Sequence, residues 1–429
     1  MLNIDFSEVE DKIINEGLTS RNSIAKEAIE NYSRLKFPNN KDEEWRFTNI
    51  SPLLKHNFQF ISGSSEISRK DIKKFLFGET FRYQFVFVNG KFVKELSSNI
   101  PSQNIDISDI ETAIDKNAEI FKKNFAKYSK SKESYFSALN SSNINAGAFI
   151  YITDNSVIKE PIHLLFISDF KLKALVQPRN LFISGKNSQA TIIEHYAAIS
   201  DNTYFTNAVT EIFAGENSTL NHIKIQEESR NSFHISETAI EMESNSNFES
   251  AAISFGGEIS RDEINCKFNG QGCEATLNGL FMLDDSQLHD THTAIDHAKP
   301  FCNSHEHYKG ILDGKSRGVF NGKVMVRPNA QKTNAFQENN NIILSNEALV
   351  NTKPQLEIFA DDVKCSHGAT IGQIDQDSMF YLKSRGIGEE TARTILIHAF
   401  ASDVVKSIKV NELRDYLENI LELRFNKEK

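Results

Sequence analysis

Two groups of cysteine and histidine residues are the best candidates for chemistry in this 429-residue sequence. The first group is the pair Cys365 and His367, which is followed by Gly368. Residues two apart on a strand point to the same side, so a thiolate and an imidazole would face one space, and both can hold iron in iron–sulfur centres. The same spacing also fits a half-buried thiol beside an exposed histidine. The pair therefore defines a candidate site whose function the spacing leaves open.

The second group is denser and lies between residues 289 and 307. Its members are His289, His292, His297, Cys302, His305 and His307. Imidazole and thiolate bind zinc, iron or copper, and His305 and His307 would share one face of a strand, with Cys302 three residues earlier. The spacings match no zinc-finger or HExxH pattern. We therefore favour structural roles for most of the group, with a metal site at Cys302, His305 and His307 as the alternative.

Other catalytic patterns have little support in the sequence. It contains no GxSxG motif, no P-loop and no dinucleotide-binding glycine pattern. The acidic pairs Asp284-Asp285 and Asp361-Asp362 are of the kind that β-helical polysaccharide-cleaving enzymes use. Such enzymes usually act outside the cell, whereas the acidic start of this chain is unlike a signal or transit peptide. We expect no catalytic residues here.

Composition narrows the cellular setting. Acidic residues outnumber basic ones by 58 to 48, which gives a net charge of −10 and argues against nucleic acid or anionic membranes as partners. No run approaches the roughly 18–20 apolar residues of a membrane span. Four cysteines in so long a chain do not form a disulfide framework. These features predict a cytoplasmic protein.

An internal repeat must position the candidate residues. Polar turns with Asn or Gly recur before strand-like segments, and Ser188, Ser218, Ser246 and Cys273 mark steps of 30, 28 and 27 residues. A near-constant period of this length indicates a solenoid or a propeller. Each period has room for only two or three short strands, and no Trp-Asp signature recurs, so the repeat favours a parallel β-helix.

The pattern predicts a mainly β protein of three parts. Residues 1–145 form a mostly helical domain with a β-hairpin near residues 82–97, which Asn89-Gly90 indicates. Residues 146–372 form the β-helix core, and residues 373–429 form a helical domain with amphipathic stripes. The ends of a strand array expose unpaired edges, and we expect a partner to bind at such an edge.

Several long strings in the sequence resemble the SufB/SufD family of the SUF iron–sulfur cluster assembly system. They are LHDTHTAIDHAKP (288–300), HEHYKGILDGKSRGVFNGKVMV (305–326) and the run 339–372, which ends in FADDVKCSHGATIG. The segment DEEWRFTN (42–49), which alone would read as a charged turn anchored by Trp45, is similar to a signature of the SufD branch, and FYLKSRGIGEETAR (380–393) also matches the family.

The resemblance implies a right-handed parallel β-helix between helical domains, acting as a non-catalytic scaffold. It implies pairing of the β-helix with SufB, and docking of the ATPase SufC, which hydrolyses the ATP, on the C-terminal helices. The docking candidates are Glu389, Glu390, Arg393 and Phe400. The family leaves open whether a flavin binds and whether the isolated chain forms homodimers. It implies no tightly bound cofactor in the isolated chain.

The resemblance also assigns roles at the interface. It implies that His367 contributes to a transient iron–sulfur cluster at the SufB interface, and it extends to Cys365 less securely. The position of a SufB thiol proposed to receive sulfur aligns with Ala348, which favours the SufD branch. A SufB-like subunit, and a self-contained metalloprotein that uses the His289–His307 group, are the alternatives.

Overall fold

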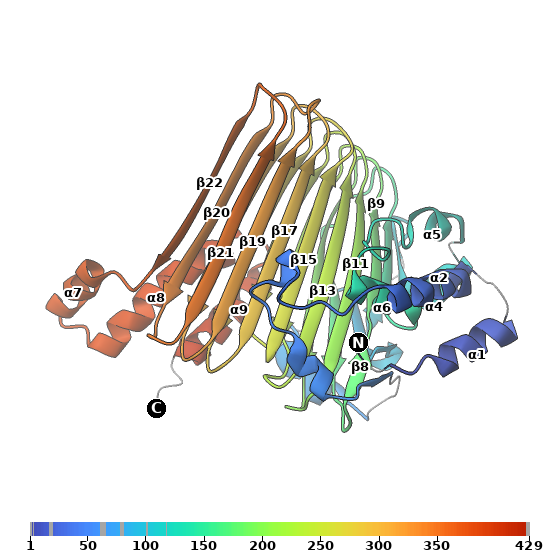
Figure 1. The fold of residues 1–429 in the computed structure, drawn as a ribbon, viewed down its shortest axis with the longest axis horizontal. Helices are drawn as coiled ribbons and strands as arrows, with labels where there is room; N and C mark the ends of the chain where they lie inside the picture. Colours follow the sequence, from blue (N-terminus) through green and yellow to red (C-terminus); the bar gives the residue numbers. More distant parts are fainter. Residues whose placement is uncertain are drawn as a thin grey trace.

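The computed structural model describes residues 4–16, 20–60, 66–77, 81–99, 102–116 and 118–425, together with Leu2. The fold is a β-solenoid made of two stacks of parallel strands, with helices at both ends (Figure 1). Successive strands along the solenoid alternate between the two sheets, and each pairs with the strand one coil earlier and one coil later. The prediction of a mainly β solenoid flanked by helices is confirmed.

The first sheet contains the following strands: β1 (Gln59–Phe60), β5 (Ile105–Asp109), β6 (Ala148–Ile152), β8 (Ala174–Val176), β9 (Arg179–Ser184), β11 (Phe205–Ala214), β13 (Phe233–Met242), β15 (Ile259–Phe268), β17 (Leu288–His297), β19 (Arg317–Val326) and β21 (Leu349–Ile358). The second sheet contains β2 (Tyr83–Val88), β3 (Lys91–Phe92), β4 (Ser98–Asn99), β7 (Ile162–Ser168), β10 (Gln189–Ala198), β12 (Thr219–Glu227), β14 (Asn247–Ser254), β16 (Glu274–Leu283), β18 (Asn303–Leu312), β20 (Asn334–Ile343) and β22 (Lys364–Gly372).

Turn chemistry explains why the repeat was visible in the sequence. The four residues that marked the period directly precede residues that pair in register: Gln189 with Thr219, then Asn247, then Glu274. The residue before each mark has a positive φ, as in Asn187 (53°) and Gly272 (69°), a conformation that Asn and Gly tolerate best. The marking hydroxyl closes two of these turns, since Ser188 Oγ donates to the Gly185 carbonyl at 2.7 Å and Ser246 Oγ donates to the Glu243 carbonyl at 2.6 Å. The predicted register is confirmed.

The solenoid interior combines aromatic and polar side chains. Near the first coils, inward rings stack on one another, with Phe87 against Phe166 and Phe166 against Tyr196 at centroid distances of 4.7 and 4.9 Å. Near the last coils, several inward positions of β18 and β20 are polar and buried, among them Glu306 and Gln337. Buried polar groups also occur in the middle coils, where His222 contacts Glu194 at 2.9 Å, so polar side chains occur along much of the interior.

The start of the solenoid extends across the boundary predicted at residue 146. β2 pairs antiparallel with β3 through a hairpin at Asn89-Gly90 and also pairs parallel with β7, while β5 pairs antiparallel with β6. The helices and 3-10 turns of this region are α1 (Ser7–Glu16), α2 (Ser20–Arg34), η1 (Glu43–Trp45), η2 (Ser51–Lys55), α3 (Arg69–Ile72), η3 (Lys73–Phe75), η4 (Lys94–Leu96), α4 (Ile110–Lys116), α5 (Ala118–Asn124) and α6 (Tyr135–Ser142).

Three helices follow the last strand: α7 (Gln376–Ser384), α8 (Glu389–Ser407) and α9 (Asn411–Phe425). Asp375 caps α7 by accepting the Ser378 N–H at 2.9 Å, as its position before the helix predicts. The apolar faces of α8 and α9 pack on the outer side of the second sheet, for example Ile397 and Leu417 near Ile253. No helix of the described residues is long and apolar enough to cross a membrane.

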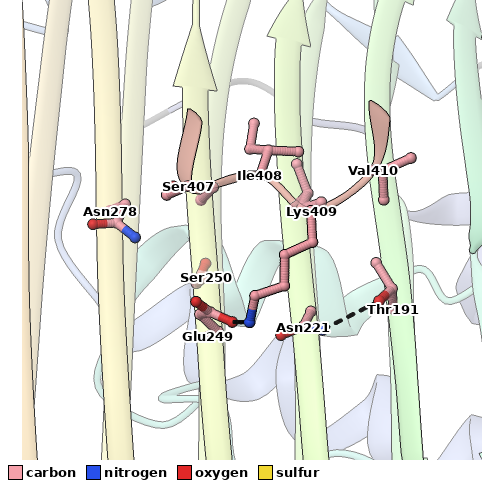
Figure 2. Close-up of a pocket in the computed structure, with 11 residues that line it drawn as sticks. Thr191, Asn221, Glu249, Ser250, Asn278, Ser407, Ile408, Lys409 and Val410 are labelled. Carbon is pink, nitrogen blue, oxygen red and sulfur yellow. Dashed lines mark hydrogen bonds and ion pairs between the residues drawn. The ribbon is translucent and has the colours of Figure 1, made fainter. Parts of the chain in front are cut away.

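The loop between α8 and α9 lies across the outer side of the second sheet (Figure 2). Lys409 of this loop forms an ion pair with Glu249 on β14. The cavity beneath the loop measures only about 20 Å³, enough for a water molecule but not for a substrate. The ion pair therefore links the C-terminal helical domain to the second sheet, and the cavity beneath the loop is too small to be a substrate site.

Candidate functional site

Cys365 and His367 lie on β22, the last strand of the second sheet. Cys365 pairs in register with Ala335 and His367 with Gln337, both of which are buried inward-facing residues of β20. Both candidate side chains therefore belong to the inner side of the final coil. Cys365 is half-buried and packs beside Val326 and Ala360, whereas His367 is exposed. The structure thus places the pair on one face, as the spacing predicts.

The outer edge of β22 is open. In the described residues β22 pairs only with β20, and α8 packs farther back on β16 and β18, so nearly every residue of β22 is exposed. Figure 1 shows β22 as the last strand of the stack. Large apolar side chains are exposed on these last coils: Phe336, Leu349, Ile358, Phe359 and Ile371. An exposed strand edge with apolar neighbours is a surface suited to pairing with another chain.

The two candidate ligands differ in burial, and this affects how readily each could bind a metal. Burial raises the pKa of the Cys365 thiol, against a smaller opposite effect of its backbone contact with Ala335. The thiolate is the form that binds metal, so a raised pKa disfavours Cys365 as a ligand. The His367 ring is exposed, so a metal could reach it.

The His289–His307 group does not converge on one point. His289 and His297 face the interior, where His289 contacts Ser260 at 2.7 Å and His297 contacts Ser304 at 2.9 Å. Burial lowers the pKa of each to about 4, so both rings are neutral at pH 7. They are hydrogen-bonded interior residues.

The other members of the group point elsewhere. Cys302 is buried inside the solenoid, His292 lies on the outer side near Asp290, and His305 stacks on Phe336 with ring centroids 5.3 Å apart. His307, also on the outer side of β18, is half-buried. Within the described ranges, no three or more His, Cys, Asp or Glu side chains are grouped so that they could hold a metal ion. The arrangement therefore gives the metal-site alternative at Cys302, His305 and His307 no support.

A buried polar column beneath His367 was missed by the sequence analysis. Glu306 on β18 pairs in register with Gln337 on β20, and Gln337 Nε2 donates to Glu306 Oε2 at 2.5 Å. Burial raises the pKa of Glu306 to about 7, which outweighs the lowering effects of Thr293 and Gln337. The sequence signal was available, because polar residues occupy alternate, inward positions of both strands.

The segment 42–48, here called the N-terminal strap, binds the outer side of the first sheet. Trp45 is buried under the Arg261 guanidinium, whose carbon lies 3.9 Å from the ring centroid. Thr48 Oγ1 donates to Asp290 Oδ2 at 2.6 Å, and Lys353 on β21 contacts Glu43 at 2.5 Å. The strap therefore connects β15, β17 and β21. Its tryptophan anchors it, as expected for a charged turn that contains one buried ring.

The four predicted docking residues divide into two pairs. Glu389 and Glu390 are exposed in the first turn of α8. Arg393 and Phe400 instead face the solenoid, since Arg393 Nη2 donates to the Leu344 carbonyl at 3.4 Å and the Phe400 ring lies under Lys309 Nζ at 4.6 Å. Helix α7 has no buried residue, and its Phe380 and Tyr381 are exposed.

Ala348, the residue expected to align with a proposed sulfur-receiving thiol, precedes β21 and is buried. It packs in an apolar cluster with Phe281, Leu283, Leu312 and Val350. Its methyl group offers no nucleophile.

These features define a class: a two-sheet parallel β-solenoid with terminal helical domains and a Cys–His pair on an open last strand. Comparison with known proteins identifies the family. Residues 166–400 match the model of the SUF system FeS cluster assembly, SufBD core domain, and residues 4–164 match that of the SufBD protein N-terminal region. The chain belongs to the SufBD family.

Individual relatives agree with this assignment. An iron–sulfur cluster assembly SufBD family protein of Synechocystis is 36% identical over 91% of this chain and 88% of its own length. The iron–sulfur cluster assembly protein SufD of Escherichia coli is 31% identical over 92% of this chain and 91% of its own length. Similarity therefore extends over nearly the whole chain in both cases.

Proposed function

We propose that this chain is a SufD-type scaffold subunit that supports formation of nascent iron–sulfur clusters at an interface with SufB. The observation behind this proposal is the open last strand β22, which presents His367 at an unpaired edge. Family membership and the similarity to Escherichia coli SufD support the assembly role. The iron–sulfur cluster is the cargo of this scaffold rather than a resident cofactor.

The exposed edge favours a partner of matching architecture. A strand with free N–H and C=O groups along one side is best satisfied by another strand, and a parallel coil of a homologous solenoid offers one at the right spacing. The exposed apolar residues beside β22, such as Phe359 and Ile371, would be covered in the same contact. SufB, the homologous subunit, fits this requirement.

His367 is the residue that we assign to the cluster. Its ring is exposed on the inner side of the last coil, and imidazole is an established iron ligand. Cys365, with its raised pKa and half-buried position, is assigned a packing role beside it. Buried Ala348 supports the SufD-type over the SufB-type role, because no thiol stands where sulfur would be received.

The ATPase SufC is proposed to dock on the exposed side of α7 and α8. The contact residues would be Glu389 and Glu390 together with Phe380 and Tyr381, whose side chains are exposed. Arg393 and Phe400 are reassigned to holding α8 on the solenoid, in keeping with their contacts. ATP hydrolysis is assigned to SufC, since this sequence has no P-loop.

The test is anaerobic reconstitution of the complex formed with the SufB and SufC of the same organism. His367→Ala should leave the complex intact on size-exclusion chromatography while cluster formation, followed by absorbance and iron content, falls strongly. His305→Ala, an exposed histidine on the outer side of β18, is the matched control and should form clusters normally. Normal cluster yield in the His367→Ala complex would refute the assignment.

A further inference from the structure

Three inward residues form one column at the C-terminal end of the solenoid. Glu306, Gln337 and His367 occupy the same register on β18, β20 and β22. Neighbouring strands are about 4.8 Å apart, so each side chain lies within reach of the next. Gln337 is therefore the residue directly between a buried carboxyl group and the exposed imidazole.

Glu306 determines how the Gln337 amide is oriented. At pH 8, above the pKa of about 7 that burial gives Glu306, the ionised carboxylate only accepts hydrogen bonds and therefore requires the NH₂ end of the amide. Gln337 Nε2 does donate to Glu306 Oε2 at 2.5 Å. Gly322 on β19 faces the same amide, and a Cβ at that position would lie 2.3 Å from Nε2. The glycine thus provides the space in which the amide lies.

The other end of the amide is buried and unused. Gln337 is 3% exposed, and its Oε1 atom has no hydrogen-bond partner among the described residues. A buried carbonyl without a donor is unfavourable, so a donor within reach would be held firmly. The next inward residue of the column on the open side is His367, whose ring has an N–H to give.

We propose that Gln337 is a positioning residue for His367: its carbonyl accepts one ring N–H and leaves the other ring nitrogen free for iron. Histidines that bind metals generally donate their second ring N–H to a carbonyl or carboxylate, which selects the tautomer and fixes the ring plane. The Glu306–Gln337 pair supplies that acceptor before any partner is present. This inference rests on the proposed role of His367.

The tautomer of His367 can be measured in the isolated chain without any cluster. The chain is labelled with [15N]histidine, and long-range nitrogen–proton NMR correlations are recorded at pH 8, where a neutral ring shows distinct shifts for its two nitrogens. The His367 signals are those missing from the His367→Asn protein. We expect one tautomer to dominate in the wild type, and Gln337→Leu to change the ratio by about fivefold, as expected for one hydrogen bond.

Asn341→Leu is the matched control. Asn341 is a buried amide on the same strand that also contacts β22, through the Thr370 carbonyl at 3.3 Å, but it pairs in register with Ile371. It should leave the His367 ratio unchanged. An unchanged ratio in Gln337→Leu, or an equal change in both variants, would overturn the inference.

Failure of the proposed function would look different. In the reconstituted complex, Gln337→Leu should slow cluster formation, whereas His367→Ala should abolish most of it. If His367→Ala formed clusters normally while Gln337→Leu still changed the tautomer ratio, the cluster role of His367 would be wrong and the positioning contact would stand.

Discussion

How the N-terminal strap is held on the first sheet can be tested directly, because its Trp45 is the single tryptophan of the chain. The change is Asp290→Asn. Asp290 is fully buried, accepts from Thr48 of the strap and forms an ion pair with Arg261, which covers the Trp45 ring. Removing its charge should release the strap and expose the tryptophan.

The magnitude follows from burial. The side chains of Arg261 and Asp290 are 1% and 0% exposed, and removing one partner of such a pair typically costs about 3–5 kcal/mol. Arg261 retains Glu263 at 2.6 Å, so we expect a value near the lower limit, about 3 kcal/mol. Arg261 and His292 hold the pKa of Asp290 below its usual range despite burial, which agrees with a strongly favoured charge.

Intrinsic fluorescence with acrylamide quenching is the assay, and chemical denaturation gives the accompanying loss of stability. Asp290→Asn should shift the emission to longer wavelength and increase quenching. The control is Asp296→Asn on the same strand, whose partner Arg327 is 51% exposed, and it should cost about 0–1 kcal/mol with unchanged emission. Equal emission and equal midpoints for wild type and Asp290→Asn would refute the reasoning.

The same strap should respond to pH through His292 and Glu44. Burial lowers the pKa of His292, but Asp290 and Glu44 more than compensate, so the pKa is raised. The contacts of protonated His292 with these two carboxylates therefore stabilise the fold fully below about pH 6.5, and this contribution is lost as the pH rises through the folded pKa. The hydrogen bond with His292 lowers the pKa of Glu44, so its contribution is lost only in acid. Trp45 quenching should therefore increase as the pH rises above about 6.5, and His292→Gln should remove that increase.

Two further predictions concern the solenoid interior. Cys365 should be the one thiol that a maleimide labels in the folded chain, because the other three, Cys266, Cys273 and Cys302, are buried. Four thiols should be labelled after unfolding, and none in folded Cys365→Ser. Labelling of more than one thiol in the folded chain would contradict the burial of the other three. Gly279→Ala should cost about 1–3 kcal/mol, because its Cβ would lie 2.1 Å from the Tyr308 ring, while Gly368→Ala, with nothing within 4 Å, should change the denaturation midpoint little. Equal denaturation midpoints for the two alanine variants would contradict the close packing of the Tyr308 ring against Gly279.

The coils were predictable because their turns obey local chemistry. Asn187 supplies a positive φ and the following Ser188 closes the turn, and Gly272 with the following Cys273 does the same in a later coil. The period therefore follows from short local segments. The start of the solenoid was less predictable. β2 joins the second sheet by pairing with β7, which lies more than 70 residues later, and no local pattern specifies that contact.

In the candidate site, too, local sequence patterns did not reveal which side chains meet. Closeness in sequence suggested a cluster at residues 289–307, but alternation along a strand sends His289 inward and His292 outward. Glu306 and Gln337, 31 positions apart, do meet, because the coil period brings them into register. In a solenoid, side chains one coil period apart in the sequence meet, whereas side chains that are close in the sequence often do not.

The architecture also favours the open end as the place for the proposed interface. Every interior strand of a parallel stack has its backbone groups paired on both sides, so free hydrogen-bonding capacity remains only at the ends. At the first end, β3 and β5 are antiparallel to their neighbours and interrupt the parallel stacking. At the other end β22 stays parallel and uncovered, and it is the strand on which His367 lies above the Glu306–Gln337 pair. A partner coil that continues the parallel stacking of the described strands would add at β22, and under the proposed function it would meet the imidazole there.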